Sequence, residues 1–205
     1  QKIQKKFLRK RESKNAVKLL LINISTHFTK DQDISEYDVL EPPLGLITLL
    51  SYANYILKEK IKGKIIKSRV DFDNYEELNK QIKNFAPDII GVSTMTFHKD
   101  FFHKAIKSIR DNDFKKMIIV GGPHPTTSFK EVLKDKNIDI CTIGEGEATI
   151  VEIIEKYIEN NFQKLLYDDL IKIDGIAFSE DNYQHMNKKT EVSVDGGYRI
   201  SAALN

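Results

Sequence analysis

The sequence of 205 residues contains a single cysteine, Cys141, and no tryptophan. One cysteine excludes an internal disulfide, and it also excludes a zinc or iron–sulfur site built from several cysteines of this chain. No run approaches the roughly 20 apolar residues that a membrane-spanning helix needs. The first 18 residues contain no apolar stretch typical of a signal peptide. These absences predict a cytoplasmic, reducing environment and no membrane span.

Positive charge is concentrated at the start of the chain. Residues 1–18 carry eight basic side chains against one acidic side chain, although the net charge of the whole chain is only +2. The remainder is therefore mildly acidic. Residues 1–16 are interpreted as a basic arm, either a solvated leader or a short helix, although such arms can also bind nucleic acid or anionic lipid. The arm lacks the aromatic interleaving of single-strand binders, so no nucleic-acid partner is expected.

Short apolar runs alternate with amphipathic stretches between residues 17 and 161. Strands are expected at residues 18–24, 64–70, 88–93, 116–120 and 138–143. Helices are expected at residues 44–60 after Pro42-Pro43, at 75–85, around 101–109, around 129–133 and at 150–158. Five such units imply a parallel sheet with helices on both faces. Right-handed crossovers then predict a doubly wound, five-stranded α/β fold of flavodoxin-like or Rossmann-like type.

The pattern changes after Asn161. Residues 162–189 are expected to contain a β-hairpin, with LIKIDGIAFS and DNYQH on either side of a turn at Asp181-Asn182. Residues 190–205 show no apolar period and are interpreted as a tail or linker. The expected organisation is therefore a basic arm (1–16), an α/β domain (17–161), a hairpin (162–189) and a tail (190–205).

Small or glycine-rich loops follow four of the expected strands. They contain Ser25-Thr26, Ser93–Thr96, Gly121–His124 and Gly144–Glu147. Ligands of open parallel sheets bind beyond the carboxyl ends of the strands, where these loops should converge. Glycine permits close approach of the backbone to a ligand, and hydroxyl groups can donate or accept hydrogen bonds. A single loop of this kind is typical of a tight turn, but four at one edge predict a ligand site.

The common nucleotide motifs do not fit these loops. Dinucleotide binding needs G-x-G-x-x-G after the first strand, whereas GEGEAT follows the fifth and places Thr149 at the third glycine position. The Gly-Lys-Ser/Thr of a P-loop is absent. Flavin mononucleotide could use the hydroxyl groups of STHFT, but that loop has no glycine. A phosphorelay receiver would need clustered acidic residues after the first strand, and none are present there.

Four segments together resemble a known family. EPPLGLITLLSYA, PDIIGVSTMTF, IIVGGPHPT and DICTIGEGEATIVEII occur in the order and spacing of the cobalamin-binding domain of radical S-adenosylmethionine enzymes. The resemblance covers about residues 17–180 and includes IDGIAF, which resembles the bridge into the barrel that holds the iron–sulfur cluster. It implies that cobalamin (vitamin B12) is bound with its corrin ring across the strand ends.

The resemblance also implies which residues contact the cofactor. The nucleotide tail would enter a cleft lined by Ser93, Gly121 and Gly122, and the loop through Pro43 and Leu44 would lie near the upper face of the corrin. The full set of implied cofactor-binding residues is Ser25, Thr26, Pro43, Leu44, Ser93, Thr94, Met95, Gly121, Gly122, Pro123, His124, Gly144, Glu145, Gly146 and Glu147.

No metal ligand is expected from this chain. Methionine-synthase-like domains carry D-x-H-x-x-G after the first strand, with the histidine as lower cobalt ligand. His27 occupies that loop, but Ser25 replaces the aspartate and Lys30 the glycine, a departure typical of the radical branch. His124 is interpreted as a loop-positioning side chain. The other histidines lack the spacing of a zinc site, and they are His98 and His103, expected to be solvated or capping, and His185 in the hairpin.

No catalytic residue is expected here either. The family's radical chemistry needs a C-x-x-x-C-x-x-C motif, which Cys141 alone cannot supply, and Glu145 and Glu147 are interpreted as acids at a helix N-terminus. The chain is therefore expected to be the cobalamin-binding domain of a radical methyltransferase or cyclase. S-adenosylmethionine and the [4Fe-4S] cluster would belong to a barrel domain in cis or in trans. The alternatives are a corrin-free module that positions a substrate or partner, and a domain for flavin or another small ligand.

Overall fold

The computed structural model describes residues 16–24, 27–29, 41–180, 183–186, 193–194 and 197–198. Ser25 and Thr26 of the predicted site lie outside the described residues, as do residues 1–15 of the predicted arm and the predicted turn at Asp181-Asn182. The statements below concern the described residues.

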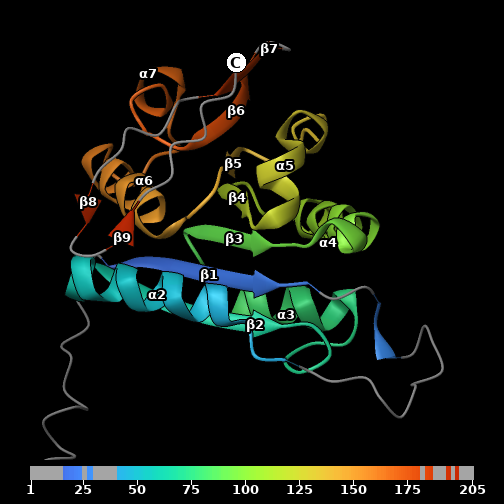
Figure 1. Ribbon diagram of the computed structural model, residues 1–205. Helices are drawn as coiled ribbons and strands as arrows, with labels where there is room; N and C mark the ends of the chain where they lie inside the picture. The colour runs from blue at the N-terminus through green and yellow to red at the C-terminus, as the bar shows by residue number, and fades with distance from the viewer. Residues whose placement is uncertain are drawn as a thin grey trace, which may run out of the picture.

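Seven strands form one sheet in the order β2-β1-β3-β4-β5-β6-β7 (Figure 1). The strands are β1 Val17–Asn23, β2 Ile61–Lys67, β3 Ile89–Ser93, β4 Met117–Gly121, β5 Ile140–Thr142, β6 Ile176–Glu180 and β7 Tyr183–Met186. The first five are parallel, and β6 and β7 are antiparallel. The order β2-β1-β3-β4-β5 is that of flavodoxin-like folds, so the predicted doubly wound sheet is confirmed. The predicted hairpin is present and extends the same sheet.

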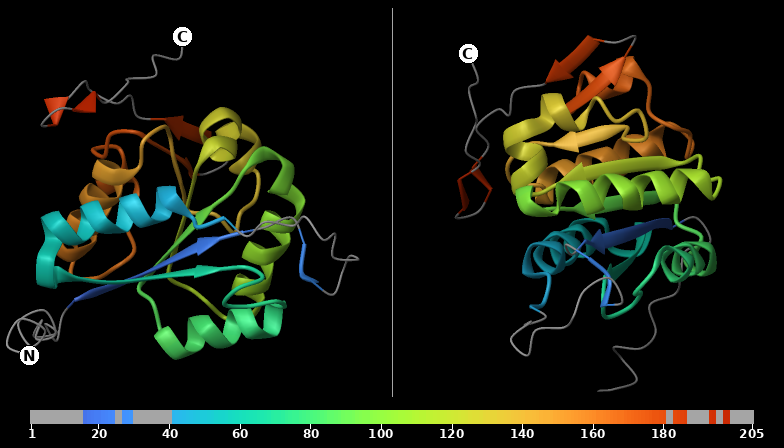
Figure 2. Two further views of the ribbon diagram at one scale, coloured as in Figure 1. Left: turned by 60° about the horizontal axis from the view of Figure 1, so that its bottom comes forward. Right: turned by 90° about the vertical axis from the view of Figure 1, so that its right-hand side faces the viewer.

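Helices cover both faces of the sheet (Figures 1 and 2). They are α2 Leu44–Leu57, α3 Tyr75–Phe85, α4 Lys99–Asp111, α5 Pro123–Val132, α6 Glu147–Glu159 and α7 Tyr167–Leu170, with 3-10 turns η2 Lys58–Lys60 and η3 Thr96–His98. Helices α2, α6 and α7 pack on one face, which encloses the α2/α6 core. Helices α3, α4 and α5 pack on the other and enclose the α3/α4/α5 core. None of these helices is long and apolar enough to cross a membrane.

Some element boundaries differ from the sequence-based expectation. Strand β2 begins at Ile61 rather than residue 64, because its ladder with β1 extends back to Val17. Helix α5 begins at Pro123 instead of near residue 129, since proline is tolerated at the first helical position. The first strand of the hairpin begins at Ile176, after the short helix α7. Strands β8 (Ser193–Val194) and β9 (Gly197–Tyr198) form a separate two-stranded ladder within the segment interpreted as a tail.

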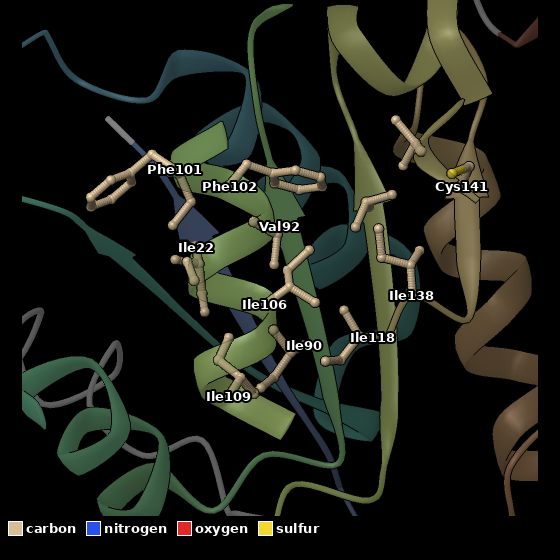
Figure 3. Packing of buried hydrophobic residues seen from close by; sticks show 14 of the residues in the cluster. Ile22, Ile90, Val92, Phe101, Phe102, Ile106, Ile109, Ile118, Ile138 and Cys141 are labelled. Atoms are coloured by element: carbon tan, nitrogen blue, oxygen red, sulfur yellow. The ribbon is translucent and has the colours of Figure 1, made fainter. Parts of the chain in front are cut away.

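Alternation along the buried strands divides their side chains between the two cores. In β4, Ile119 belongs to the α2/α6 core, whereas Ile118 and Val120 belong to the α3/α4/α5 core. Figure 3 shows part of the latter, with Phe102 and Ile106 of α4 facing β3 and β4. Both faces of these parallel strands are therefore covered, which explains their uninterrupted apolar sequences.

The side chain of Cys141 is fully buried in β5, as its apolar surroundings in the sequence predict. Burial raises the pKa of this thiol far above its usual range, because the thiolate would lose its hydration. The reactive form of cysteine is the thiolate, so the thiol is expected to resist alkylation in the folded protein. Mass spectrometry after iodoacetamide treatment should find the native chain unmodified and the guanidinium-unfolded chain singly modified. Rapid alkylation of the native chain would contradict this.

His98 stands at the N-cap position of α4, but its side chain makes no capping hydrogen bond, and both His98 and His103 are partly buried rather than solvated. Nδ1 of His98 lies 3.0 Å from the carbonyl oxygen of Ile24, and Nδ1 of His103 lies 2.7 Å from Oδ2 of Asp135. Burial lowers the pKa of His98. Each imidazole links α4 or its entry turn to a segment far away in the sequence, so their role here is structural.

Candidate functional site

A cavity of about 160 Å³ lies at the carboxyl ends of β1, β3, β4 and β5. It is enclosed between the sheet and the first turns of α2 and α6, on the face that carries the α2/α6 core. The sheet order reverses between β1 and β3, which is the place where doubly wound folds bind ligands. We refer to this cavity as the strand-end cleft.

Two glycines inside strands form the floor of the strand-end cleft. Gly91 and Gly121 occupy positions on the α2/α6 face where β3 and β4 would otherwise place side chains. A Cβ atom at Gly91 would lie 2.6 Å from Cδ2 of Leu21, and one at Gly121 would collide with Oγ1 of Thr142. Glycine inside a strand often marks close approach of a ligand. Because no side chains stand at these two positions, Leu21 and Thr142 lie directly over the strands, and the cavity remains above them.

The walls of the cleft are apolar and come from two helices. Leu46 and Leu49 project from α2, and Ile150 projects from α6. The helices meet closely here, since a Cβ atom at Gly146 would lie 3.2 Å from Cδ1 of Leu49. At Gly45 a Cβ atom would find nothing within 4 Å, so the cleft opens beside the first turn of α2.

The polar side chains of the cleft lie near its mouth, apart from Thr142, which lies on the floor beside Gly121. Oγ1 of Thr142 donates a hydrogen bond to the carbonyl oxygen of Val120 at 3.2 Å. Ser93 ends β3, and Glu145 and Glu147 stand at the entrance to α6. Glu147 lies in the first turn of that helix, where a carboxylate is stabilised by the helix dipole, as the sequence predicts.

The turn after β4 requires glycine. Gly122 has a φ of +99°, and a Cβ atom there would lie 2.9 Å from the carbonyl oxygen of Thr94 and 3.1 Å from Oγ of Ser93. L-residues rarely adopt this φ, so a side chain would be strained as well as crowded. Gly122 thereby holds the loop after β4 against the loop after β3, at the edge of the cleft.

About half of the predicted cofactor-binding residues meet at this cleft. Those that line it are Ser93, Gly121, Gly122, Gly144, Glu145, Gly146 and Glu147. Those that do not line it are Pro43, Leu44, Thr94, Met95, Pro123 and His124. Leu44 and Met95 are exposed at the same end of the sheet, with 68% and 42% of their surface accessible.

Several lining residues were not foreseen from the sequence. Gly91 and Thr142 lie inside strands, and Gly45 and Leu49 lie on α2. The glycine inside the apolar run DIIGVS is a signal that could have identified Gly91. Leu49 carries no such signal, because its neighbours LLS would suit any buried helix.

Neither of the two histidines considered as ligands lines the cleft. His124 is 96% buried, and its ring packs edge-on to Phe102 of the α3/α4/α5 core, with centroids 6.5 Å apart. Burial, together with the nearby His103 and Lys99, lowers the pKa of His124. Phe28, beside His27, packs on Phe101 in the same core. Within the described ranges, no group of three His, Cys, Asp or Glu side chains is placed to hold a metal ion.

A doubly wound sheet with a glycine-floored cleft at its switch point defines a domain that binds a small ligand or cofactor. The chain belongs to the B12 binding domain family, whose family model matches residues 49–154. The family predicted from the sequence is thereby confirmed.

Relatives of this chain include enzymes several times its length. An uncharacterized methyltransferase of Pyrococcus horikoshii, PH0819, is 32% identical over 118 residues, which cover 56% of this chain and 24% of the relative. The anaerobic magnesium-protoporphyrin IX monomethyl ester cyclase of Synechocystis sp. is 42% identical over 143 residues, which cover 68% of this chain and 27% of the relative. The chain thus spans about a quarter of the length of these relatives.

Solved structures with the same fold come from cobalamin-dependent enzymes. The radical S-adenosylmethionine methyltransferase TsrM from Kitasatospora setae, with cobalamin and a [4Fe-4S] cluster bound, matches with a TM-score of 0.65 and 14% identity over 90% of this chain and 31% of that chain. The radical enzyme OxsB, with aqua-cobalamin and S-adenosylmethionine bound, matches with a TM-score of 0.64 and 21% identity. The match covers 84% of this chain and 22% of that chain. This chain is therefore a B12-binding domain resembling those of cobalamin-dependent radical S-adenosylmethionine methyltransferases and cyclases.

Proposed function

We propose that this chain holds cobalamin for a radical S-adenosylmethionine methyltransferase or cyclase, with the nucleotide tail of the cofactor in the strand-end cleft. The observation that carries the proposal is the cavity above Gly91 and Gly121, which is closed by the apolar side chains of α2 and α6. Protein interiors are normally close-packed, and a cavity between a sheet and its helices forfeits packing contacts. A planar aromatic base inserted there would restore those contacts.

The remaining proposed contacts surround the mouth of the cleft. The corrin ring would lie across the strand ends, against the exposed apolar side chains of Leu44 and Met95. The loops at Ser93, Gly122 and Gly144–Glu147 would border the ring or the tail. When bound, cobalamin supplies a cobalt centre that carries and transfers alkyl groups. This chain would position the cofactor and shield the base from water, and we assign it no cobalt ligand.

The wider organisation is also a proposal. Residues 17–161 would form the cofactor domain, residues 162–189 the bridge to a barrel that holds S-adenosylmethionine and the cluster, and residues 1–16 and 190–205 an arm and a tail. The greater length of the relatives and the position of β6 and β7 at the edge of the sheet support this division. The single buried thiol suits a cytoplasmic, reducing environment.

Purified chain mixed with hydroxocobalamin and then desalted should retain about one corrin per chain. If the base occupies the cleft it cannot also coordinate cobalt, so the bound cofactor should show the visible spectrum of the base-off form that free cobamides adopt in acid. Absence of a retained corrin band would contradict the proposal and favour the corrin-free module. A flavin spectrum in the protein as purified would contradict it in favour of flavin binding.

A further inference from the structure

Among the residues that the structure describes, the closed end of the strand-end cleft is lined by apolar side chains. Leu21 and Ile119 of the sheet, Leu46 of α2 and Ile150 of α6 are all more than nine-tenths buried. The backbone of Leu21, Gly91 and Ile119 is paired in the ladders of β1, β3 and β4. The closed end therefore offers a ligand no side-chain hydrogen bond, and the backbone of its floor is already paired.

The hydroxyl groups of the cleft offer a ligand few further hydrogen bonds. Thr142 Oγ1 uses its proton on the carbonyl oxygen of Val120, so this atom can only accept a further hydrogen bond. Ser93 is at the mouth, beside the Gly122 turn. The carboxylates of Glu145 and Glu147 also stand at the mouth. Within the described part of the chain, the acceptor at Thr142 is thus the one polar side-chain group on the floor.

We infer that the cleft selects among cobamides by their lower base, favouring a ring with an apolar outer edge, such as dimethylbenzimidazole, over a purine. The inference rests on the proposed function. An adenine base would bring an exocyclic amine and ring nitrogens into the cleft, and Thr142 could satisfy at most one of them. Polar groups buried without partners oppose binding, so the adenine-based cobamide should bind at least about tenfold more weakly.

Three corrinoids test this with the unaltered chain. Equilibrium dialysis, followed by corrin absorbance, compares hydroxocobalamin, its adenine-based analogue, and cobinamide, which lacks the nucleotide. Hydroxocobalamin is expected to bind at least about tenfold more tightly than either of the others. Equal or tighter binding of the adenine analogue, or of cobinamide, would overturn the inference while leaving corrin binding intact. Failure of all three to bind would instead overturn the proposed function, and the inference with it.

Two variants on α2 test whether the preference between the two cobamides arises in the strand-end cleft. Leu49→Gln places an amide in the cleft wall, where it could form a hydrogen bond with the edge of adenine. It should therefore reduce the ratio between the dissociation constants of the adenine-based analogue and hydroxocobalamin several-fold. Leu50→Gln is the matched control, because Leu50 is also partly buried on α2 but packs over Gly63 and does not line the cleft. It should leave the preference unchanged. An equal change in both variants would show that the selectivity does not arise in this cleft.

Discussion

Replacing Gly121 with valine is expected to abolish retention of hydroxocobalamin, raising its dissociation constant at least about a hundredfold, equivalent to about 2.7 kcal/mol. The backbone of Gly121 has an ordinary φ, so a side chain is permitted by conformation alone. Its Cβ atom would meet Oγ1 of Thr142, and the two methyl groups would fill the floor of the cleft. The base would then have to be displaced from the site.

Gly63→Val is the matched control for Gly121→Val. Gly63 lies in β2, on the same face of the sheet as Gly121, and its Cβ atom would collide with the side chain of Leu50 outside the cleft. Overpacking should destabilise both variants by about 1–3 kcal/mol. Only Gly121→Val should lose the corrin in equilibrium dialysis. Retention by Gly121→Val, or equal loss in the two variants, would show that the base does not use this cleft.

Replacing Arg110 with methionine is expected to lower the free energy of unfolding by about 3–5 kcal/mol. The guanidinium is only 17% exposed, and it donates to the carbonyl oxygens of Asn137, Phe114 and Lys116 at 3.0, 2.8 and 2.7 Å. It also donates to Oδ2 of Asp139 at 2.7 Å. Methionine would fill much of the volume but leave three carbonyl groups and a buried carboxylate short of a partner.

The carboxylate of Asp139 is what makes this loss large. It is 12% exposed, accepts from the backbone N–H of Ile118 at 2.7 Å, and would keep Lys164 as its one cationic partner among the described residues. The network connects the end of α4 to the starts of β4 and β5. It therefore lies at the amino-terminal ends of the strands, whereas the cleft lies at their carboxyl ends. Arg110→Met should therefore lower the free energy of unfolding while leaving the geometry of the cleft largely unchanged.

Lys107→Met on the same helix is the control for Arg110→Met. Lys107 pairs with Asp111 at 2.7 Å, but both side chains are more than half exposed. Exposed pairs of this kind contribute little, so its free energy of unfolding should change by no more than about 0.5 kcal/mol. Guanidinium unfolding followed by circular dichroism measures both variants. Similar changes in the two would contradict the assigned role of the Arg110–Asp139 network.

The order of the elements could be predicted from local patterns. Apolar runs such as KLLLINI suit strands buried on both faces, and Pro42-Pro43 and Asn74 mark helix starts. The Asn74 side chain accepts a hydrogen bond from the backbone N–H of Glu77, as an N-cap should. Boundaries were less predictable, since the start of β2 depends on the length of β1 beside it. The docking of the hairpin onto β5 likewise depends on pairing between distant segments.

The candidate site, like the fold, was predictable in part from local sequence and depended in part on the packing of distant segments. Its glycine-rich loops could be predicted, because Gly121-Gly122 and Gly144–Glu147 follow strands directly and parallel strands end at one edge. Ser25 and Thr26 lie outside the described residues, so their assignment stays a prediction. Pro43, Thr94 and His124 neighbour the site in sequence but do not line the cleft, because the direction of a side chain depends on helix phase and strand alternation.

The sequence by itself determined the class of fold, the family and the strand ends at which the candidate site lies. The fold class follows from short-range periodicity, the family from the resemblance of four segments in order and spacing, and the site from loops that directly follow strands. Only the tertiary structure decided the floor and walls of the cleft, at Gly91, Thr142 and Leu49. The physical reason is that a cavity arises where side chains from distant strands and helices fail to meet, and this depends on register and packing.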